Sequence, residues 1–247
     1  MTLSTNFRSL VRGAARQRIE HPEIRRMIGY QDSCAPAAEV SFPAAVVRDV
    51  QVARWLRERR LAIDVRTIAE LHAAISVGIH PLLMTVHADR LDLADLRRAS
   101  AAGVGRLVLS DPGQVSSLPR KRPQNVMLRR AVGAPMGGCD VAAEAVIGRR
   151  CTTLIGLVCE IGCTTGDFGA VGASISDLIA QMKRIRHRHN VVLTRLILGV
   201  GDFGLGTESR PACGGIVRRD LAEQIDESLD DACAALRFPR PVIVLSA

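Results

Sequence analysis

The sequence predicts an α/β protein built as a single (β/α)8 barrel. Eight short segments rich in Val, Ile and Leu recur along the chain, and a helix-like segment follows each of them except the last. Eight strand–helix repeats in about 250 residues are typical of a TIM-type barrel. The 247 residues, 47% of them apolar, suffice for one sizeable core. An open, doubly wound sheet, which uses fewer strands, is the alternative.

The predicted strands cover residues 40–47, 61–65, 82–86, 106–110, 126–129, 152–158, 193–198 and 241–245. Pro43 conflicts locally with the first of them, because proline has no N–H to donate to a neighbouring strand. We therefore expect Pro43 at a strand end or beside a small irregularity.

Helix signals fill the intervals between these strands. Asp92 is a suitable N-cap, and the pair Asp111-Pro112 combines an N-cap with proline at the first helical position. Further on, Ser174 or Ser176 is expected to open one helix and Asp220 another. Apolar spacing predicts the inward-facing positions of three of the helices: Val50, Ala53 and Leu56; Leu71, Ala74 and Ile75; Leu93, Leu96 and Ala99.

The first 38 residues differ in composition from the rest. They are rich in arginine and predict a basic helical extension before the barrel, which we place at residues 39–247. The N-terminus lacks the apolar segment of a secretory signal, and no run approaches the ~20 apolar residues of a membrane span. Seven cysteines without a framework spacing fit a reducing compartment. We therefore expect a cytoplasmic protein that does not enter a membrane.

The chain carries a net charge of +8, and only two of its 33 basic residues are lysine, Lys121 and Lys183. A strongly basic domain can contact nucleic acid. Here, however, no basic patch is interleaved with aromatic residues, so nucleic-acid binding is not favoured. Cys159, Cys163, His187 and His189 lack the spacing of a zinc site, and no metal is predicted.

Polar residues gather at the predicted strand ends. In a barrel the catalytic side chains sit at the C-terminal ends of the strands. Reading those ends gives the candidates Asp64, Thr67, His87, Asp89, Asp111, Arg129, Arg130, Glu160, Cys163 and the segment Gly199–Asp202. Because strand ends of a barrel meet at one face, these groups predict a polar site there, unless they merely line a solvated loop face.

A glycine-rich loop follows the seventh strand. It contains Gly199, Gly201, Gly204 and Gly206. Unhindered backbone N–H groups can form an anion-binding nest, and barrels often bind phosphate after strands seven and eight. The loop therefore predicts a site for a phosphate-bearing small molecule; a flexible surface loop is the alternative.

Two motifs support a family resemblance. The segment Phe42 to Val46 (FPAAV) stands where one group of barrel enzymes has Tyr-Ala-x-Lys-Ala, and Asp64 to Leu71 (DVRTIAEL) stands for Asp-Val-x-Ser-x-Gly-Glu-Leu. Residues 39–247 thus resemble the barrel domain of the alanine-racemase-fold, pyridoxal-phosphate-dependent amino-acid decarboxylases of the diaminopimelate and ornithine type. The resemblance implies a barrel of the alanine racemase N-terminal-domain kind and pyridoxal 5'-phosphate as cofactor. It also implies cofactor contacts at Asp64, Arg129, Gly199, Val200 and Gly201.

The same comparison shows departures. Ala45 stands at the position of the Schiff-base lysine, and Glu160 stands at that of a histidine that stacks on the cofactor ring. The chain stops at Ala247, before the turn that would follow the last strand, and we see no C-terminal β domain. We therefore expect a decarboxylase homologue that is inactive by itself, and no catalytic residue is assigned.

Two alternatives stay open. The chain could be an active pyridoxal-dependent decarboxylase or racemase, using another lysine or completed in a homodimer or by a partner chain. It could also be a basic barrel that binds nucleic acid or protein. Visible imine absorbance separates the first alternative from an inactive homologue, and salt-dependent nucleic-acid binding would support the second.

Overall fold

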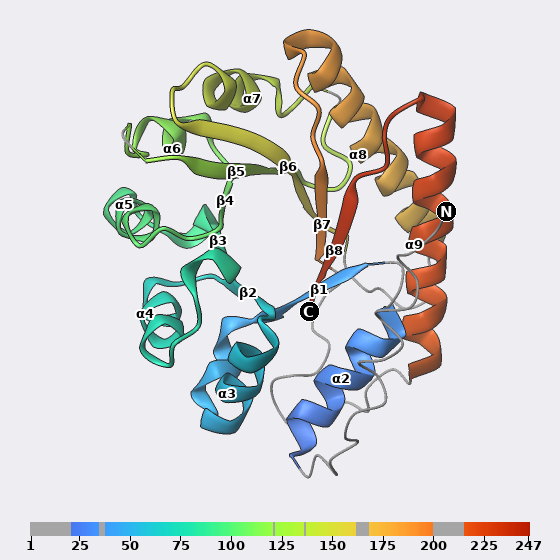
Figure 1. The fold of residues 1–247 in the computed structure, drawn as a ribbon. Coiled ribbons are helices and arrows are strands. Elements are labelled where there is room, and N and C mark those ends of the chain that lie inside the picture. Colours follow the sequence, from blue (N-terminus) through green and yellow to red (C-terminus); the bar gives the residue numbers. More distant parts are fainter. Residues whose placement is uncertain (1–20, 35–37, 121, 136, 162–167, 200–214) are drawn as a thin grey trace, which may run out of the picture.

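The computed structural model describes residues 21–34, 38–120, 122–135, 137–161, 168–199 and 215–247, without the side chains of residues 168, 169 and 215–218. Eight parallel strands close into a barrel in the order β1 to β8 (Figure 1). The predicted barrel is confirmed, and so is the number of strands. The strands are β1 Glu39–Pro43, β2 Ala62–Val65, β3 Met84–His87, β4 Arg106–Leu109, β5 Gln124–Arg129, β6 Thr152–Glu160, β7 Arg195–Gly199 and β8 Val242–Ser246.

Helices alternate with the strands. Those within the described residues are α2 Pro22–Cys34, α3 Val50–Arg59, α4 Ile68–Ser76, α5 Leu93–Ala101, α6 Pro112–Ser116, α7 Asp140–Ile147, α8 Phe168–His189 and α9 Gly215–Leu236. Three short 3-10 helices cover Ala44–Arg48, Pro81–Leu83 and Ala88–Arg90. The expected N-caps are confirmed, since Asp92 accepts from Asp95 N–H and Asp111 accepts from Gly113 N–H.

The first strand is shorter than expected. It ends at Pro43, whose register partner is Asp64 on β2, and Ala44–Arg48 forms a 3-10 helix instead of continuing to Val47. The missing N–H of Pro43 accounts for this end, because a parallel strand needs that donor to continue its pairing. Pro43 therefore lies at a strand end, as expected.

Two helix starts were wrong. Helix α8 begins at Phe168, upstream of both Ser174 and Ser176, and α9 begins at Gly215, upstream of Asp220. The Ser174 hydroxyl donates to the carbonyl of Ala170, one turn earlier, rather than capping. A serine inside a helix can satisfy its hydroxyl in this way, so a capping residue type alone does not mark a start.

Three residues expected to face inward are exposed instead. Val50 is 77% exposed, Leu93 49% and Ile75 38%. Val50 and Leu93 are the first residues of α3 and α5. The buried stripe begins at Val52 in α3 and at Leu96 in α5.

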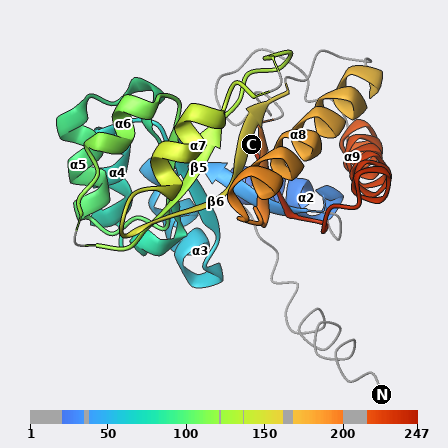
Figure 2. The same cartoon turned by 90° about the horizontal axis from the view of Figure 1, so that it is seen from above.

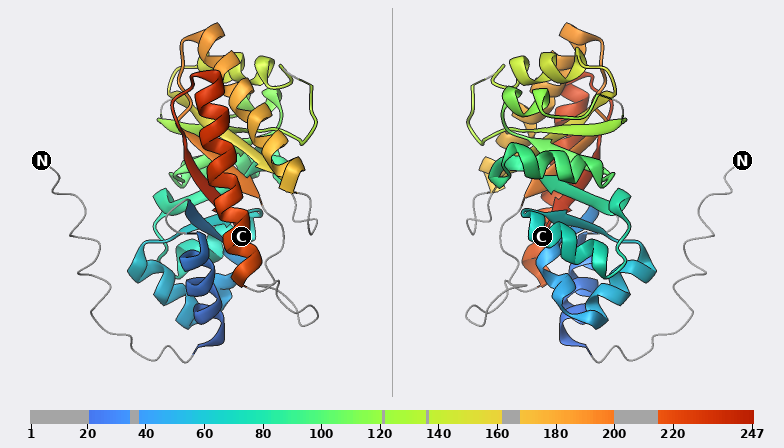
Figure 3. Two further views of the ribbon diagram at one scale, coloured as in Figure 1. Left: turned by 90° about the vertical axis from the view of Figure 1, so that its right-hand side faces the viewer. Right: turned by 90° about the vertical axis from the view of Figure 1, so that its left-hand side faces the viewer.

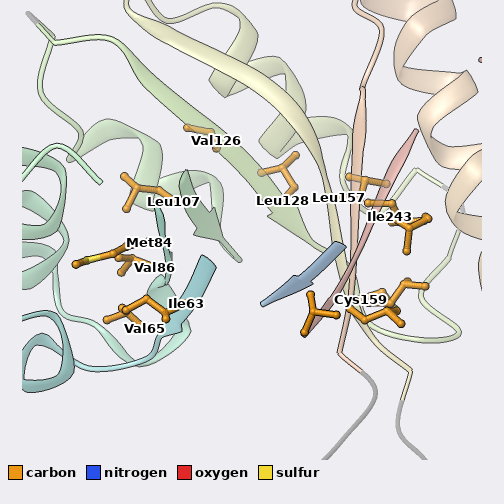
Figure 4. Packing of buried hydrophobic residues seen from close by; sticks show 14 of the residues in the cluster. Ile63, Val65, Met84, Val86, Leu107, Val126, Leu128, Leu157, Cys159 and Ile243 are labelled. Atoms are coloured by element: carbon orange, nitrogen blue, oxygen red, sulfur yellow. The ribbon is translucent and has the colours of Figure 1, made fainter. Parts of the chain in front are cut away.

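The core has two parts, and the alternation of side chains along each strand separates them. Leu107 and Leu109 of β4 belong to the large cluster between strands and helices, whereas Val108 belongs to a small separate cluster. That small cluster contains Val108, Met127, Val158, Ile197 and Val244, one residue from each of β4 to β8. Figure 4 shows alternate residues such as Ile63 and Val65 within the large cluster. The small cluster therefore lies inside the barrel, on the side formed by β4 to β8.

Helices α2, α8 and α9 cover one flank of the barrel, and α3 to α6 lie on the other side (Figure 2). Helix α9 packs along both α8 and α2, as Figure 3 also shows. Ile24, Met27, Tyr30 and Cys34 of α2 are buried in the large cluster. Part of the N-terminal extension thus packs on the barrel; its division from residues 39–247 as a separate domain stays a prediction. Within the described residues, no helix combines the length and apolarity needed to cross a membrane.

Candidate functional site

The C-terminal ends of the strands carry a connected polar network, here called the mouth network. Its members are Asp64 on β2, His87 on β3, Arg129 on β5, Glu160 on β6 and Ser246 on β8, joined by Arg66 and Asp89 just beyond β2 and β3. The predicted convergence of polar groups on one face is confirmed for these strand ends.

Asp64 is the most buried charged group of the mouth network. Its Oδ1 lies 3.2 Å from His87 Nε2, and its Oδ2 accepts from the Ser246 hydroxyl at 2.7 Å. Burial by itself would raise the pKa of this carboxyl, but the hydrogen bond from His87, together with that from Ser246, outweighs burial and holds the pKa below its usual value. The carboxylate is therefore ionised and fully enclosed by its partners.

The hydrogen bonds of His87 define its tautomer. Arg129 Nη2 lies 2.7 Å from His87 Nδ1, and a guanidinium can only donate. Nδ1 must therefore be the acceptor, which leaves the ring proton on Nε2, where it is donated to Asp64. The neutral His87 ring thus hydrogen-bonds to Asp64 through one nitrogen and to Arg129 through the other, and in this way it holds the Arg129 guanidinium in a fixed orientation relative to Asp64.

Arg129 connects the buried part of the mouth network to its exposed rim. Its Nη1 donates to Glu160 Oε1 at 2.9 Å, and its Nη2 lies 3.5 Å from Asp89 Oδ1. Arg66 Nη2 reaches the same Glu160 oxygen at 3.4 Å. The Glu160 side chain is 41% exposed, whereas that of Arg129 is 17% exposed. Two arginines therefore converge on one carboxylate at the opening of the barrel.

Glu160 also lies over Gly199. The two residues are register partners on β6 and β7, and the Gly199 carbonyl accepts from Ile161 N–H at 2.8 Å. A Cβ placed on Gly199 would overlap the Glu160 carboxylate. A side chain at residue 199 would therefore require the carboxylate end of the flexible Glu160 side chain to move. We expected Gly199 to contact phosphate; Val200, Gly201 and the rest of that loop lie outside the described residues.

Other candidates serve different purposes. Thr67 caps α4 in a capping box with Glu70, and Asp111 caps α6. Arg130 is buried and donates to the Ala134 carbonyl, and Cys163 lies outside the described residues. Sequence reasoning missed Arg66 and Ser246, although both stand at a strand end, Arg66 directly after β2 and Ser246 as the last residue of β8.

The position of primary amines limits the chemistry of the mouth. The sequence contains two lysines. Lys183 is exposed on the outer helix α8, and Lys121 itself is not described. The described residues of the mouth network include no lysine, so these residues offer no primary amine.

Comparison with protein families matches residues 22–245 to the pyridoxal-binding domain of the pyridoxal-dependent decarboxylases. The chain belongs to this family. The resemblance inferred from the two sequence motifs is thereby confirmed, together with the fold that it implied.

Individual relatives agree with the family assignment. The chain is 24% identical over 235 residues to diaminopimelate decarboxylase of Mycobacterium bovis and 25% identical over 229 residues to that of Actinosynnema pretiosum. These alignments cover 84% and 83% of this chain but 53% and 51% of the relatives. The chain therefore spans about half the length of the curated relatives that it matches.

Solved structures share the fold. A diaminopimelate decarboxylase from M. jannaschii in complex with L-lysine superposes with a TM-score of 0.70 at 12% identity, over 91% of this chain and 58% of that one. A lysine/ornithine decarboxylase from Vibrio vulnificus in complex with putrescine gives 0.70 at 17% identity, over 91% and 60%. At these identities the likeness concerns the fold alone.

The described residues do not fit covalently bound pyridoxal phosphate. An imine needs a primary amine at the mouth, and no described residue there provides one. A phosphate near Gly199 would also meet the Glu160 carboxylate, and two like charges in contact repel strongly in a partly enclosed site. Arg129, the cation best placed to bind a phosphate, already pairs with Glu160.

Proposed function

We propose that this chain is a non-catalytic homologue of the diamino-acid decarboxylases, and that by itself it forms no imine with pyridoxal phosphate and releases no carbon dioxide. The observation that carries the proposal is Ala45. The motif Phe42 to Val46 aligns with the family's Tyr-Ala-x-Lys-Ala, so that a methyl group stands where the family has its Schiff-base lysine.

The local structure supports this alignment. Ala45 is exposed and lies two residues beyond Pro43, the residue that pairs with Asp64 at the end of β1. A side chain leaving this position starts at the same barrel end as the mouth network. A lysine at residue 45 would therefore be placed for imine formation at the mouth, whereas Lys183 on α8 is not.

The mouth network supports a binding rather than a catalytic role. Asp64 and His87 are only 2% and 0% exposed, and their hydrogen-bonding groups are used by Ser246, Arg129 and each other. A general base must reach its substrate within hydrogen-bond distance. These two residues therefore orient Arg129, and the groups left for a ligand are Arg66, Arg129 and Glu160.

The experiment is reductive trapping. Purified chain is incubated with equimolar pyridoxal phosphate and reduced with borohydride, and adducts are located by mass spectrometry. We expect no adduct among the mouth residues, and any minor labelling confined to Lys183, Lys121 or the N-terminal amine. Lys183→Arg is the matched control, because it removes an amine and retains the charge. Ala45→Lys should gain a weak adduct at residue 45, without turnover.

Turnover is measured as carbon dioxide release from diaminopimelate, lysine, ornithine and arginine. Pyridoxal-dependent release by the wild-type chain above the Lys183→Arg and no-protein blanks would overturn the proposal. It would favour the competing one, an active decarboxylase. Release that requires a second polypeptide would favour completion by a partner chain.

A further inference from the structure

We infer that Glu160 is a built-in anion of the barrel mouth: its carboxylate occupies the position at which Arg129, Arg66 and Gly199 would otherwise receive a small oxyanion such as inorganic phosphate or a phosphate monoester. Glu160 thereby sets the charge preference of the mouth. The inference deepens the proposed function, on which it rests for the ligand class, and it is tested without any imine chemistry.

The contacts of Glu160 are those of a bound anion. One carboxylate oxygen accepts from two guanidinium groups, Arg129 at 2.9 Å and Arg66 at 3.4 Å. These arginines come from the ends of β5 and β2, on different sides of the opening, so that the carboxylate bridges them. Guanidinium groups arranged in this way favour carboxylate and phosphate equally in geometric terms.

The glycine beneath the carboxylate gives the second observation. Gly199 is buried, and the Glu160 carboxylate occupies the position that a Cβ on Gly199 would take. The absence of a side chain at Gly199 thus allows the Glu160 carboxylate, a group of the protein itself, to lie close to the backbone. A ligand oxyanion that approached Gly199 would have to displace the Glu160 side chain first.

Displacement of Glu160 is opposed by charge. Arg129 donates to His87 and to Glu160, so a phosphate that took the position of the Glu160 carboxylate would replace it as the acceptor of the Arg129 Nη1 hydrogen bond. The released carboxylate would then lie beside a second anion, and that repulsion is only partly screened at a half-exposed site. Replacement by the neutral, nearly isosteric glutamine removes the repulsion and supplies an amide N–H that can donate to the oxyanion.

The test compares phosphate affinity in Glu160→Gln and wild type by isothermal titration at constant ionic strength. We expect Glu160→Gln to bind inorganic phosphate at least tenfold more tightly. Amide shifts on titration should centre on Gly199 and Ile161. Glu58→Gln is the matched control: Glu58 is an exposed carboxylate on α3 paired with Arg54, so this change alters the net charge equally but away from the mouth. It should leave the affinity within about twofold of wild type.

Equal affinity in Glu160→Gln and wild type would overturn the inference, as would shifts centred on the arginines of α8. If Glu160→Gln folds poorly, the inference is tested instead by measuring the effect of phosphate on the melting temperatures of Glu160→Ala and of wild type. Phosphate should raise the melting temperature of Glu160→Ala but raise that of wild type no more than chloride does. A saturable phosphate effect on wild type that maps to Gly199 would refute the idea. An imine between pyridoxal phosphate and the wild-type chain would contradict the proposed function. The comparison of phosphate affinity between Glu160→Gln and wild type would still test the role of Glu160.

Discussion

Two carboxylate–arginine networks in this protein use the same residue types to different ends. In the mouth network, Asp64 and Glu160 are linked through His87 and Arg129, on side chains from β2, β3, β5 and β6. On the flank, Asp140 at the start of α7 accepts from Gln181 at 3.0 Å, from Arg184 at 2.9 Å and from Arg188, all on α8.

The difference lies in where the partners originate. The flank network joins one helix start to one helix face, so that Asp140 fastens α7 to α8. The mouth network joins separate strand ends around an opening, and one of its carboxylates, on Glu160, is half-exposed. Carboxylates and arginines thus fasten one helix to another on the flank, whereas at the mouth they link separate strand ends through a carboxylate that is half-exposed.

The largest expected contrast is between Asp64→Ala and Asp140→Ala. Removal of the fully buried Asp64 leaves His87 and Ser246 donors unpaired, which should lower the free energy of unfolding by about 3–5 kcal/mol. Arg184 and Arg188 are about half-exposed and can turn to water, and only the buried Gln181 amide is left unpaired, so Asp140→Ala should cost about 1–3 kcal/mol. Urea unfolding measures both, with unchanged slopes as the control, and equal losses would contradict the contrast.

A glycine lies beside a carboxylate in each network, and the two differ in what opposes a side chain there. At Gly199 an added side chain meets the end of the flexible Glu160 side chain, whereas Gly137 has a φ of +89° that other residues rarely adopt. Alanine at Gly137 should cost about 1–3 kcal/mol, and alanine at Gly199 less than about 1 kcal/mol, because Glu160 can move aside. Glu160→Ala should remove most of the cost of Gly199→Ala, but Asp140→Ala should not rescue Gly137→Ala.

Thermal or urea unfolding of the four single and two double variants completes these cycles. A coupling energy near zero at Gly199 would show that its environment does not depend on Glu160. Strong coupling at Gly137 would show that contact with Asp140, rather than backbone conformation, demands glycine there.

The smallest expected effect is a change in acid sensitivity. At Asp140, burial would raise the pKa, but hydrogen bonds from Arg184 and Gln181 hold it below its usual value, as the partners of Asp64 do there. A depressed folded-state pKa gives stability that is complete above the unfolded value of about 3.9 and is lost as the pH falls through the folded value.

Asp64→Asn should therefore lose less stability than wild type below about pH 4, although it starts from a lower value. Asp140→Asn should show a weaker change of the same sign, because its arginines are exposed to screening ions. Unfolding free energies measured at a series of pH values test this. An acid slope in Asp64→Asn equal to that of wild type would show that Asp64 has the same pKa when folded and unfolded.

The sequence predicted the barrel because periodic apolar segments report burial directly. It predicted strand ends less well, since the end of β1 depends on the missing N–H of Pro43 and on pairing with β2. Helix starts such as those of α8 and α9 were placed too late because serine and aspartate also occur inside helices.

The mouth network could be predicted only in part. Asp64, His87, Asp89, Arg129 and Glu160 were found because polar residues at barrel strand ends converge. Nothing in the spacing indicated that Glu160 would fold over Gly199, since their pairing depends on the register of β6 with β7. The same limit applies to the phosphate site predicted at the glycine loop. The sequence shows that the backbone at Gly199 carries no side chain, but it does not show that the Glu160 carboxylate occupies the position beside it.

The hydrogen bond between Ser246 and Asp64 has a kinetic consequence. It joins residues 182 positions apart, and it can form only when β8 docks beside β1 and closes the barrel. Contacts this distant in sequence carry a large loop-closure cost and delay folding. The Asp64 charge is thus enclosed late in folding. We therefore expect φ-values near zero at Asp64, so that substitutions of this residue increase the rate of unfolding and leave the rate of folding almost unchanged.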